Sequence, residues 1–169
     1  MIRNIIVFAL TFCVMLTVGY LDVAVGATVG CIGQVSTFPV NGDDIIAHTT
    51  YTFRNFNDTK TIRIDRIVVR DADGNVRCDY PNLNSFPTDF KSALPPHQST
   101  RLQTSDMAGC ITPQPFGAFG AIQTVITWSF SSGKVGIPLS VTSTMAYMNM
   151  TDNETFGWPT VMCEPIVPK

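Results

Sequence analysis

The feature that most constrains this chain is an alternation of apolar and polar residues over positions 45–54. One parity carries the larger apolar side chains: Ile45, Ala47, Thr49, Tyr51 and Phe53. The other parity carries His48 and Arg54 among smaller residues. Successive side chains of a β-strand point to opposite faces of the sheet, so this pattern predicts a strand with one buried face.

A second alternating run covers positions 61–71 but changes parity in the middle. Ile62 and Ile64 share one parity, whereas Ile67 and Val69 fall on the other. One extra residue near Asp65-Arg66 would return all four side chains to the same face. The run therefore predicts a strand with a β-bulge.

Turn residues follow both runs. The segment 55–58 is Asn-Phe-Asn-Asp, and the segment 71–75 contains Gly74, which can supply a positive φ angle. We therefore predict two hairpin turns joining three strands, the third of which begins at Val76. This arrangement indicates an antiparallel sheet.

Further strands are predicted over 31–40, 100–104, 121–130, 137–148 and 156–163. Pro39 ends the first of these strands or places it at a sheet edge. The segment 79–96 predicts a long crossover with one helical turn at most, and Trp128 is expected in the core. Seven or eight strands in a chain of 169 residues with 45% hydrophobic content predict an all-β fold. We expect one antiparallel β-sandwich domain, Ig-like or related, over 28–169.

The N-terminus predicts a signal peptide over residues 1–27. Arg3 precedes an apolar run over 5–18, and Val25-Gly26-Ala27 suits a signal peptidase, so Thr28 is the expected mature start. The mature chain is then exported, either periplasmic or secreted, with no membrane span. One alternative is an uncleaved membrane anchor, although Asp22 interrupts the apolar stretch short of the roughly 20 residues that a span needs. The other alternative is a lipidated Cys31.

Cysteine usage agrees with export. Cys13 leaves with the signal peptide, and four cysteines remain, which suits two disulfides in an oxidising compartment. First and last strands of a sandwich often lie close together, so we predict a bridge between Cys31 and Cys163. The second bridge then joins Cys78 to Cys110 and fixes the long crossover between them.

Charge and spacing argue against several classes of site. The formal net charge is -2 without a run of like charges, which disfavours nucleic-acid binding. No cysteines have the close spacing of a zinc site, and Asp71-Ala72-Asp73-Gly74-Asn75 lacks the spacing of an EF-hand, so it predicts a hairpin turn. We expect no metal and no cofactor.

Several of these motifs occur together in one order. They are the segments 51–55, 64–69 and 71–76, then Leu94-Pro95-Pro96 with Ser99, and Gly117-Ala118-Phe119-Gly120 ahead of Trp128. In this respect the middle of the chain resembles a family of small exported bacterial domains of unknown function. The resemblance implies export and a β-sandwich, and it transfers no catalytic residue.

Three function classes follow. A binding module would present Phe116, Phe119 and Trp158 to an unknown protein or small ligand, although Phe116 and Phe119 could instead cap the open end of the sandwich. A subunit of a surface assembly would add a strand at an exposed edge. A secreted hydrolase would need His48 or His97 beside an acid, but no nucleophile motif accompanies either, so we expect no catalytic residues. Three Asn-x-Thr patterns, at Asn57, Asn149 and Asn153, match glycosylation acceptors.

Overall fold

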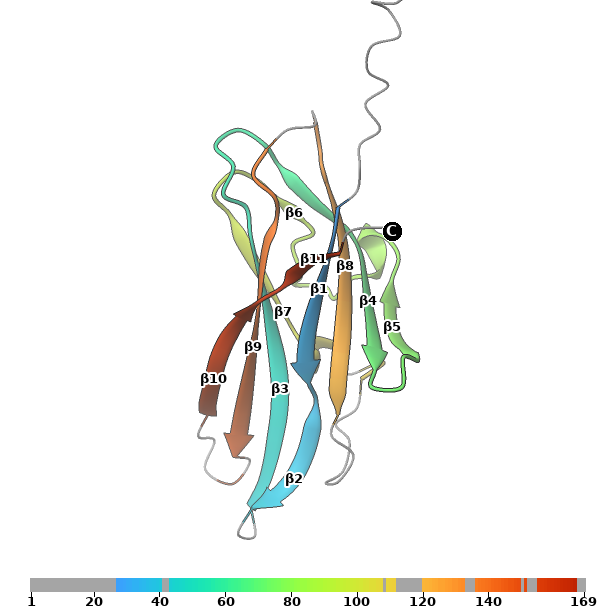
Figure 1. Cartoon of the computed structure of the whole chain (residues 1–169), viewed down its shortest axis with the longest axis vertical. Coiled ribbons are helices and arrows are strands. Elements are labelled where there is room, and N and C mark those ends of the chain that lie inside the picture. Colours follow the sequence, from blue (N-terminus) through green and yellow to red (C-terminus); the bar gives the residue numbers. More distant parts are fainter. Residues whose placement is uncertain are drawn as a thin grey trace, which may run out of the picture.

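The computed structural model describes residues 27–40, 43–107, 109–111, 120–132, 136–149, 151 and 155–166. Two antiparallel sheets face each other and enclose one core (Figure 1). The predicted all-β, antiparallel β-sandwich is confirmed. Residues 1–26 of the predicted signal peptide lie outside the described part of the chain. Ala27 is the first residue of strand β1.

The first sheet has six strands. Five of them lie in the order β11-β1-β8-β4-β5, and the sixth, β6, pairs with the same edge of β4 as β5 does. Its strands are β1 (Ala27–Gln34), β4 (Ile62–Asp71), β5 (Val76–Tyr80), β6 (Ala93–Leu94), β8 (Ala121–Phe130) and β11 (Glu164–Ile166). A single 3-10 turn, Leu83–Ser85, lies in the crossover after β5, as the sequence predicts.

The second sheet has five strands in the order β10-β9-β3-β2, with β7 sharing the same edge of β3 as β2. Its strands are β2 (Ser36–Val40), β3 (Asp43–Arg54), β7 (Ser99–Gln103), β9 (Ser140–Asn149) and β10 (Thr155–Met162). Pro39 lies in β2 at a sheet edge, as expected for a residue without an N–H donor.

The core forms where the alternating runs predict it. The apolar parity of β3 is buried, and Trp128 on β8 lies inside the sandwich. The predicted bulge in β4 is present as a register shift between Ile64 and Arg66. Because of this bulge, four β4 side chains are fully buried: Ile62, Ile64, Ile67 and Val69.

The first of the two predicted hairpins is wrong. β3 belongs to one sheet and β4 to the other, so residues 55–61 cross between the sheets. The second hairpin, between β4 and β5, is present, with Gly74 at φ 85°. There Asp71 accepts hydrogen bonds from the backbone N–H groups of Asp73 and Asn75.

A buried asparagine explains the crossover. The side-chain amide of Asn55 donates to the carbonyl oxygens of Lys60, Leu94 and Pro95, at 2.7, 2.8 and 3.0 Å. Its oxygen accepts from the backbone N–H of Asn57 at 2.9 Å. Asn57 is buried as well and pairs with both backbone groups of Ile137. These side-chain hydrogen bonds satisfy backbone groups that are not paired in a β3–β4 hairpin, and they direct the chain to the opposite sheet.

The described residues form more strands than the expected seven or eight, in part because the strand predicted over 31–40 is divided between the two sheets. β1 and β2 are nearly continuous, but the chain passes from one sheet to the other at Val35. The hydroxyl of Thr49 bonds both backbone groups of Gln34, accepting from N–H at 2.7 Å and donating to C=O at 2.9 Å. A side chain thus replaces a strand partner at the point of transfer.

Two disulfides close the fold. Cys31 is bonded to Cys163 and Cys78 to Cys110, the same pairs as the sequence predicts. In the described part of the chain, no helix has the length and apolar character needed to cross a bilayer.

Candidate functional site

The C-terminal strands form a strap, residues Val161–Ile166, that crosses the side of the sandwich. β10 pairs with β9 in one sheet, and β11 pairs with β1 in the other. Between them the N–H of Cys163 donates to the carbonyl of Val141 at 2.9 Å, and the Cys163 side chain is bonded to Cys31. The strap is therefore tied to both sheets.

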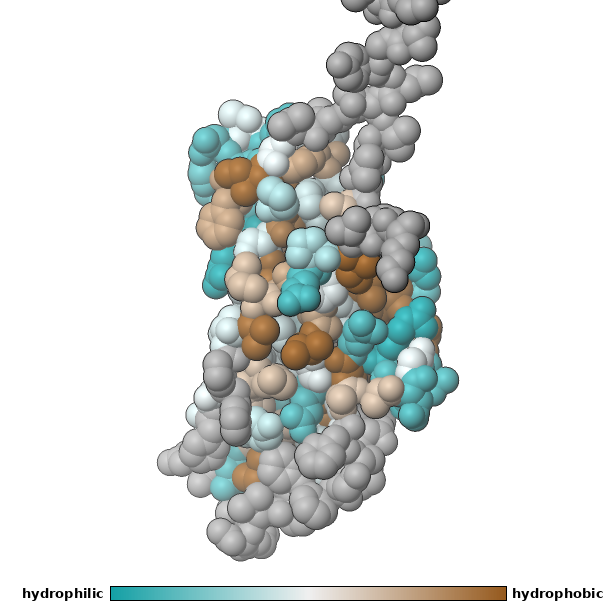
Figure 2. Space-filling model, viewed as in Figure 1, coloured by the Kyte–Doolittle hydropathy of each residue, from teal (hydrophilic) through white to brown (hydrophobic). Residues whose placement is uncertain are grey.

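An open groove of about 310 Å³ lies beside this strap. We call it the strap groove. Its lining includes Gly30, Ile32, Val161, Met162, Glu164 and Ile166. Ile32 and Met162 are each 61% exposed, Ile166 41% and Val161 40%. Apolar side chains gather across the middle of the face that Figure 2 shows, where the strap passes in front of β1 in Figure 1.

Local geometry explains why these apolar side chains point outward. Cys31 and Gly33 face the core, so Ile32 between them faces solvent. The hydroxyl of Ser143 donates to the carbonyl of Ile32 at 2.6 Å and fixes the backbone there. Gly30 lets the Ile166 side chain lie over β1, since a Cβ atom at Gly30 would be 3.1 Å from Ile166 Cδ1.

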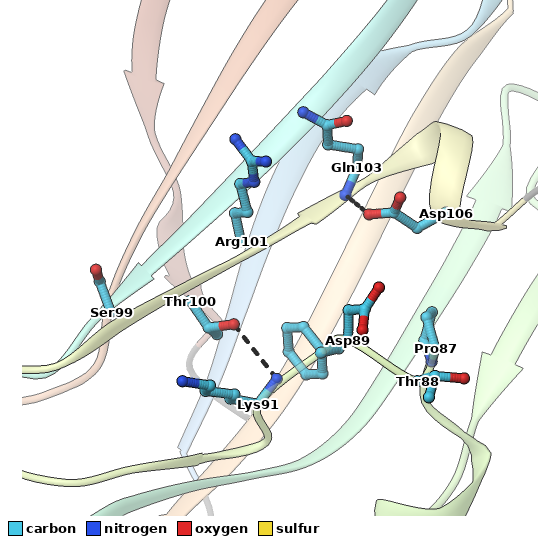
Figure 3. Close-up of a pocket in the computed structure, with 10 residues that line it drawn as sticks. Pro87, Thr88, Asp89, Lys91, Ser99, Thr100, Arg101, Gln103 and Asp106 are labelled. Atoms are coloured by element: carbon cyan, nitrogen blue, oxygen red, sulfur yellow. Dashed lines mark hydrogen bonds between the residues drawn. The ribbon is translucent and has the colours of Figure 1, made fainter.

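A second, polar groove of about 490 Å³ runs between β7 and the crossover segment 87–91. We call it the β7 groove. Figure 3 shows Asp89 and Asp106 near one end of it and Lys91 at the other. One wall is the edge of the second sheet, and the opposite wall belongs to the connection between β5 and β6.

Aromatic contacts anchor the crossover wall. The ring of Phe90 lies 5.3 Å from that of Phe53 and 5.0 Å from that of Phe86. Phe86 in turn contacts Tyr80 at 5.9 Å. The Cys78–Cys110 bridge holds β5 beside the segment that follows β7. The width of the β7 groove is therefore set by buried contacts.

The predicted binding residues are not among those whose side chains the structure describes. Phe116 and Phe119 lie in the segment 112–119, which is outside the described ranges. Trp158 lies within β10, but its side chain is outside the described part. Their role in binding stays a prediction.

Sequence reasoning missed the strap groove, although a signal for it exists. Ile32 follows Cys31, and Met162 precedes Cys163. Cysteines that bridge the interior face inward, so their strand neighbours face outward. Large apolar residues next to paired cysteines therefore indicate an exposed apolar surface around the bridge.

Neither histidine lines either groove. His48 is half-buried on β3, and burial lowers its pKa. His97 Nε2 lies 3.2 Å from Asp58 Oδ1, and both side chains are mostly exposed. Within the described ranges, no group of three or more His, Cys, Asp and Glu side chains is placed to hold a metal ion.

Comparisons with known proteins do not identify a family for this chain. No protein-family model matches the sequence, and no curated protein matches it. One solved structure, described as the X-ray structure of a Northeast Structural Genomics Consortium target, is 11% identical over 82% of this chain and 82% of its own. Its TM-score of 0.28 is too low to carry an inference about this chain.

Proposed function

We propose that this protein is an exported binding module that contacts an apolar protein partner through the strap groove. One observation carries the proposal. Among the residues that the structure describes, seven large hydrophobic side chains are exposed, and four of them line this groove. Exposed apolar side chains that gather in one place on a soluble protein often mark an interaction site.

The surroundings of the groove support this role. The Cys31–Cys163 bridge and the strand pairing on both sides hold the exposed side chains in fixed positions. A preorganised apolar surface loses little conformational entropy on binding, which favours affinity. Two disulfides suit an oxidising compartment, and the sequence signal supports export to the periplasm or beyond.

The aromatic loop with Phe116 and Phe119 is a second candidate contact surface and stays a prediction. β10 contains Trp158 as well as the groove residues Val161 and Met162, so a partner on the strap groove would contact the strand that carries Trp158. We propose no catalytic role, because the groove brings together mostly apolar side chains with one amide, Gln123, and one carboxylate, Glu164.

Site-specific photo-crosslinking in the exporting cell tests the proposal. A benzophenone amino acid replaces Ile32 in one variant and Phe56 in a control, because Phe56 is 51% exposed and does not line the strap groove. We expect a discrete covalent adduct from position 32 and none of that mass from position 56. Adding Met162→Lys to the first variant should abolish the adduct without changing the unfolding midpoint, since Met162 is exposed.

Two outcomes contradict the proposal. One is the same adduct pattern from positions 32 and 56, which would mean that contact is unselective. The other is an adduct at position 32 that persists with Met162→Lys, which would mean that the partner does not use the apolar surface.

A further inference from the structure

The free edge of β7 offers backbone groups that no described strand uses. β7 pairs with β3 on one side only. The carbonyl of Gln98 accepts the N–H of Asn55, so position 98 faces β3. Backbone groups alternate sides along a strand, and Ser99, Arg101 and Gln103 therefore face away from β3. The N–H of Gln103 donates to Asp106 at 2.8 Å, which leaves the outward groups of Arg101 and Ser99 at the edge.

Other edges of the sandwich carry features that oppose strand addition. Pro39 lies in β2, Pro159 lies beside a register break in β10, and Pro165 lies in β11. β5 carries two exposed charged residues among its five, Arg77 and Asp79. Proline and charge are the usual means of blocking an edge. β7, with the sequence Ser-Thr-Arg-Leu-Gln, contains no proline.

The β7 groove lies along this free edge and supplies the space for an added strand. Its far wall is held by the Phe53, Phe86 and Phe90 contacts and has one hydrogen bond to β7. Near one end the N–H of Lys91 donates to the Thr100 hydroxyl at 3.3 Å and links the two walls.

The charges along the groove are divided. Asp89 and Asp106 lie near the end at Gln103, and both carboxylates are exposed (Figure 3). Lys91 lies at the opposite end, and Arg101, which also lines the groove, directs its side chain away from the crossover wall. A segment that carries a basic side chain beside Gln103 would complement this arrangement.

We propose that the β7 groove binds a short extended peptide of a partner protein as an added strand, with a lysine or arginine directed at Asp89 and Asp106. The peptide backbone exchanges hydrogen bonds with the N–H and C=O of Arg101, and the crossover wall contacts its other edge. Strand addition of this kind takes its affinity from the main chain and its selectivity from the neighbouring side chains. This site is separate from the strap groove and does not depend on it.

The probe is a capped peptide of alternating threonine and valine with one central lysine, titrated into the isotope-labelled protein. We expect saturable amide shifts at Ser99 and Arg101 and slowed exchange of the Arg101 N–H. A peptide with glutamate in place of lysine should bind several-fold more weakly. A peptide N-methylated on the amides that would face β7 should bind at least about tenfold more weakly, because it cannot donate to the Arg101 carbonyl and so loses one net hydrogen bond.

Protein variants separate the main chain from the side chain. Arg101→Pro removes the outward N–H while leaving the bonds to β3, and Arg101→Ala removes only the side chain. We expect Arg101→Pro to lose binding at least about tenfold and Arg101→Ala to retain it within a few-fold. If Arg101→Pro does not fold, the N-methylated peptide tests the same bond in the unchanged protein.

The proposal is overturned if the lysine peptide produces no saturable shifts at Ser99 and Arg101. It is also overturned if the N-methylated peptide binds equally well, because binding would then not use the backbone. Equal affinity for the lysine and glutamate peptides would overturn the assignment of Asp89 and Asp106.

Discussion

At the scale of single residues, the transfer of the chain from one sheet to the other depends on a close approach at Gly33. A Cβ atom at this position would lie 2.7 Å from the Tyr51 hydroxyl oxygen and 2.8 Å from Thr49 Oγ1. Thr49 bonds the backbone of Gln34, and Tyr51 accepts a hydrogen bond from Thr124 at 2.7 Å. Any side chain at position 33 therefore displaces polar groups that are buried and already bonded.

We expect Gly33→Ala to destabilise the fold by about 1–3 kcal/mol, the usual range for overpacking a core. Gly157→Ala is the matched control, because a Cβ atom there would have no neighbour within 4 Å. Urea denaturation of both variants checks this prediction. Equal stabilities for the two would show that the approach at Gly33 is not tight.

Tyr51 predicts a specific dependence of stability on pH. Burial raises the pKa of its hydroxyl above the ordinary 10.0, against a smaller opposite effect of the hydrogen bond from Thr124. The unfolded chain therefore loses this proton first, so stability falls as the pH rises above about 10 toward the folded-state pKa. The slope contributed by one proton is at most about 1.4 kcal/mol per pH unit.

Tyr51→Phe removes this ionisation. We expect a loss of stability at neutral pH, since Thr124 loses its acceptor, together with a flatter profile above about pH 10. Denaturation curves between about pH 8 and 11 measure both effects. Parallel profiles for wild type and variant would contradict the assignment of the alkaline slope to Tyr51.

At the scale of elements, alternation identifies strands but not the sheet to which each belongs. The buried parity of β3, the bulge of β4 and the hairpin at Gly74 could all be predicted, because each depends on local pattern. The separation of β3 from β4 could not, since it depends on Asn55 reaching carbonyl groups that are distant in sequence. A polar segment with buried asparagines looks like an ordinary turn in the sequence.

The turn before β7 offers a test at this scale. The N–H of Gln98 donates to the carbonyl of Pro95 at 3.2 Å, and His97 has φ 58°. With proline at the second position and a positive φ at the third, this is a type II turn, which favours glycine where His97 lies.

We therefore expect His97→Gly to raise stability by up to about 1 kcal/mol and His97→Val to lower it by about 1 kcal/mol or more. The exposed His97–Asp58 contact is lost in both variants, so it does not contribute to the difference in stability between them. Thermal unfolding measures the difference. Valine equal to or above glycine in stability would contradict the turn assignment.

At the scale of the whole molecule, the first and last described strands of the sandwich lie side by side. β11, the last strand described, pairs with β1, the first, and Cys163 is bonded to Cys31 next to that pairing. The strap groove arises from this closure, because Ile32 and Met162 line one groove only when the strap is joined to β1. The sequence predicts the bridge and, through the apolar neighbours of Cys31 and Cys163, an exposed apolar surface around it, but the shape of the groove depends on how the strap lies beside β1.

We propose that this protein is an exported module closed by two disulfides. Mass spectrometry of the protein from its native cells, alkylated without reduction, tests it most directly. We predict a mature chain that begins at Thr28, with no label on Cys31, Cys78, Cys110 or Cys163 and linked peptides joining Cys31 to Cys163 and Cys78 to Cys110. A full-length chain that retains residues 1–27 and is labelled at all four cysteines would contradict the claim.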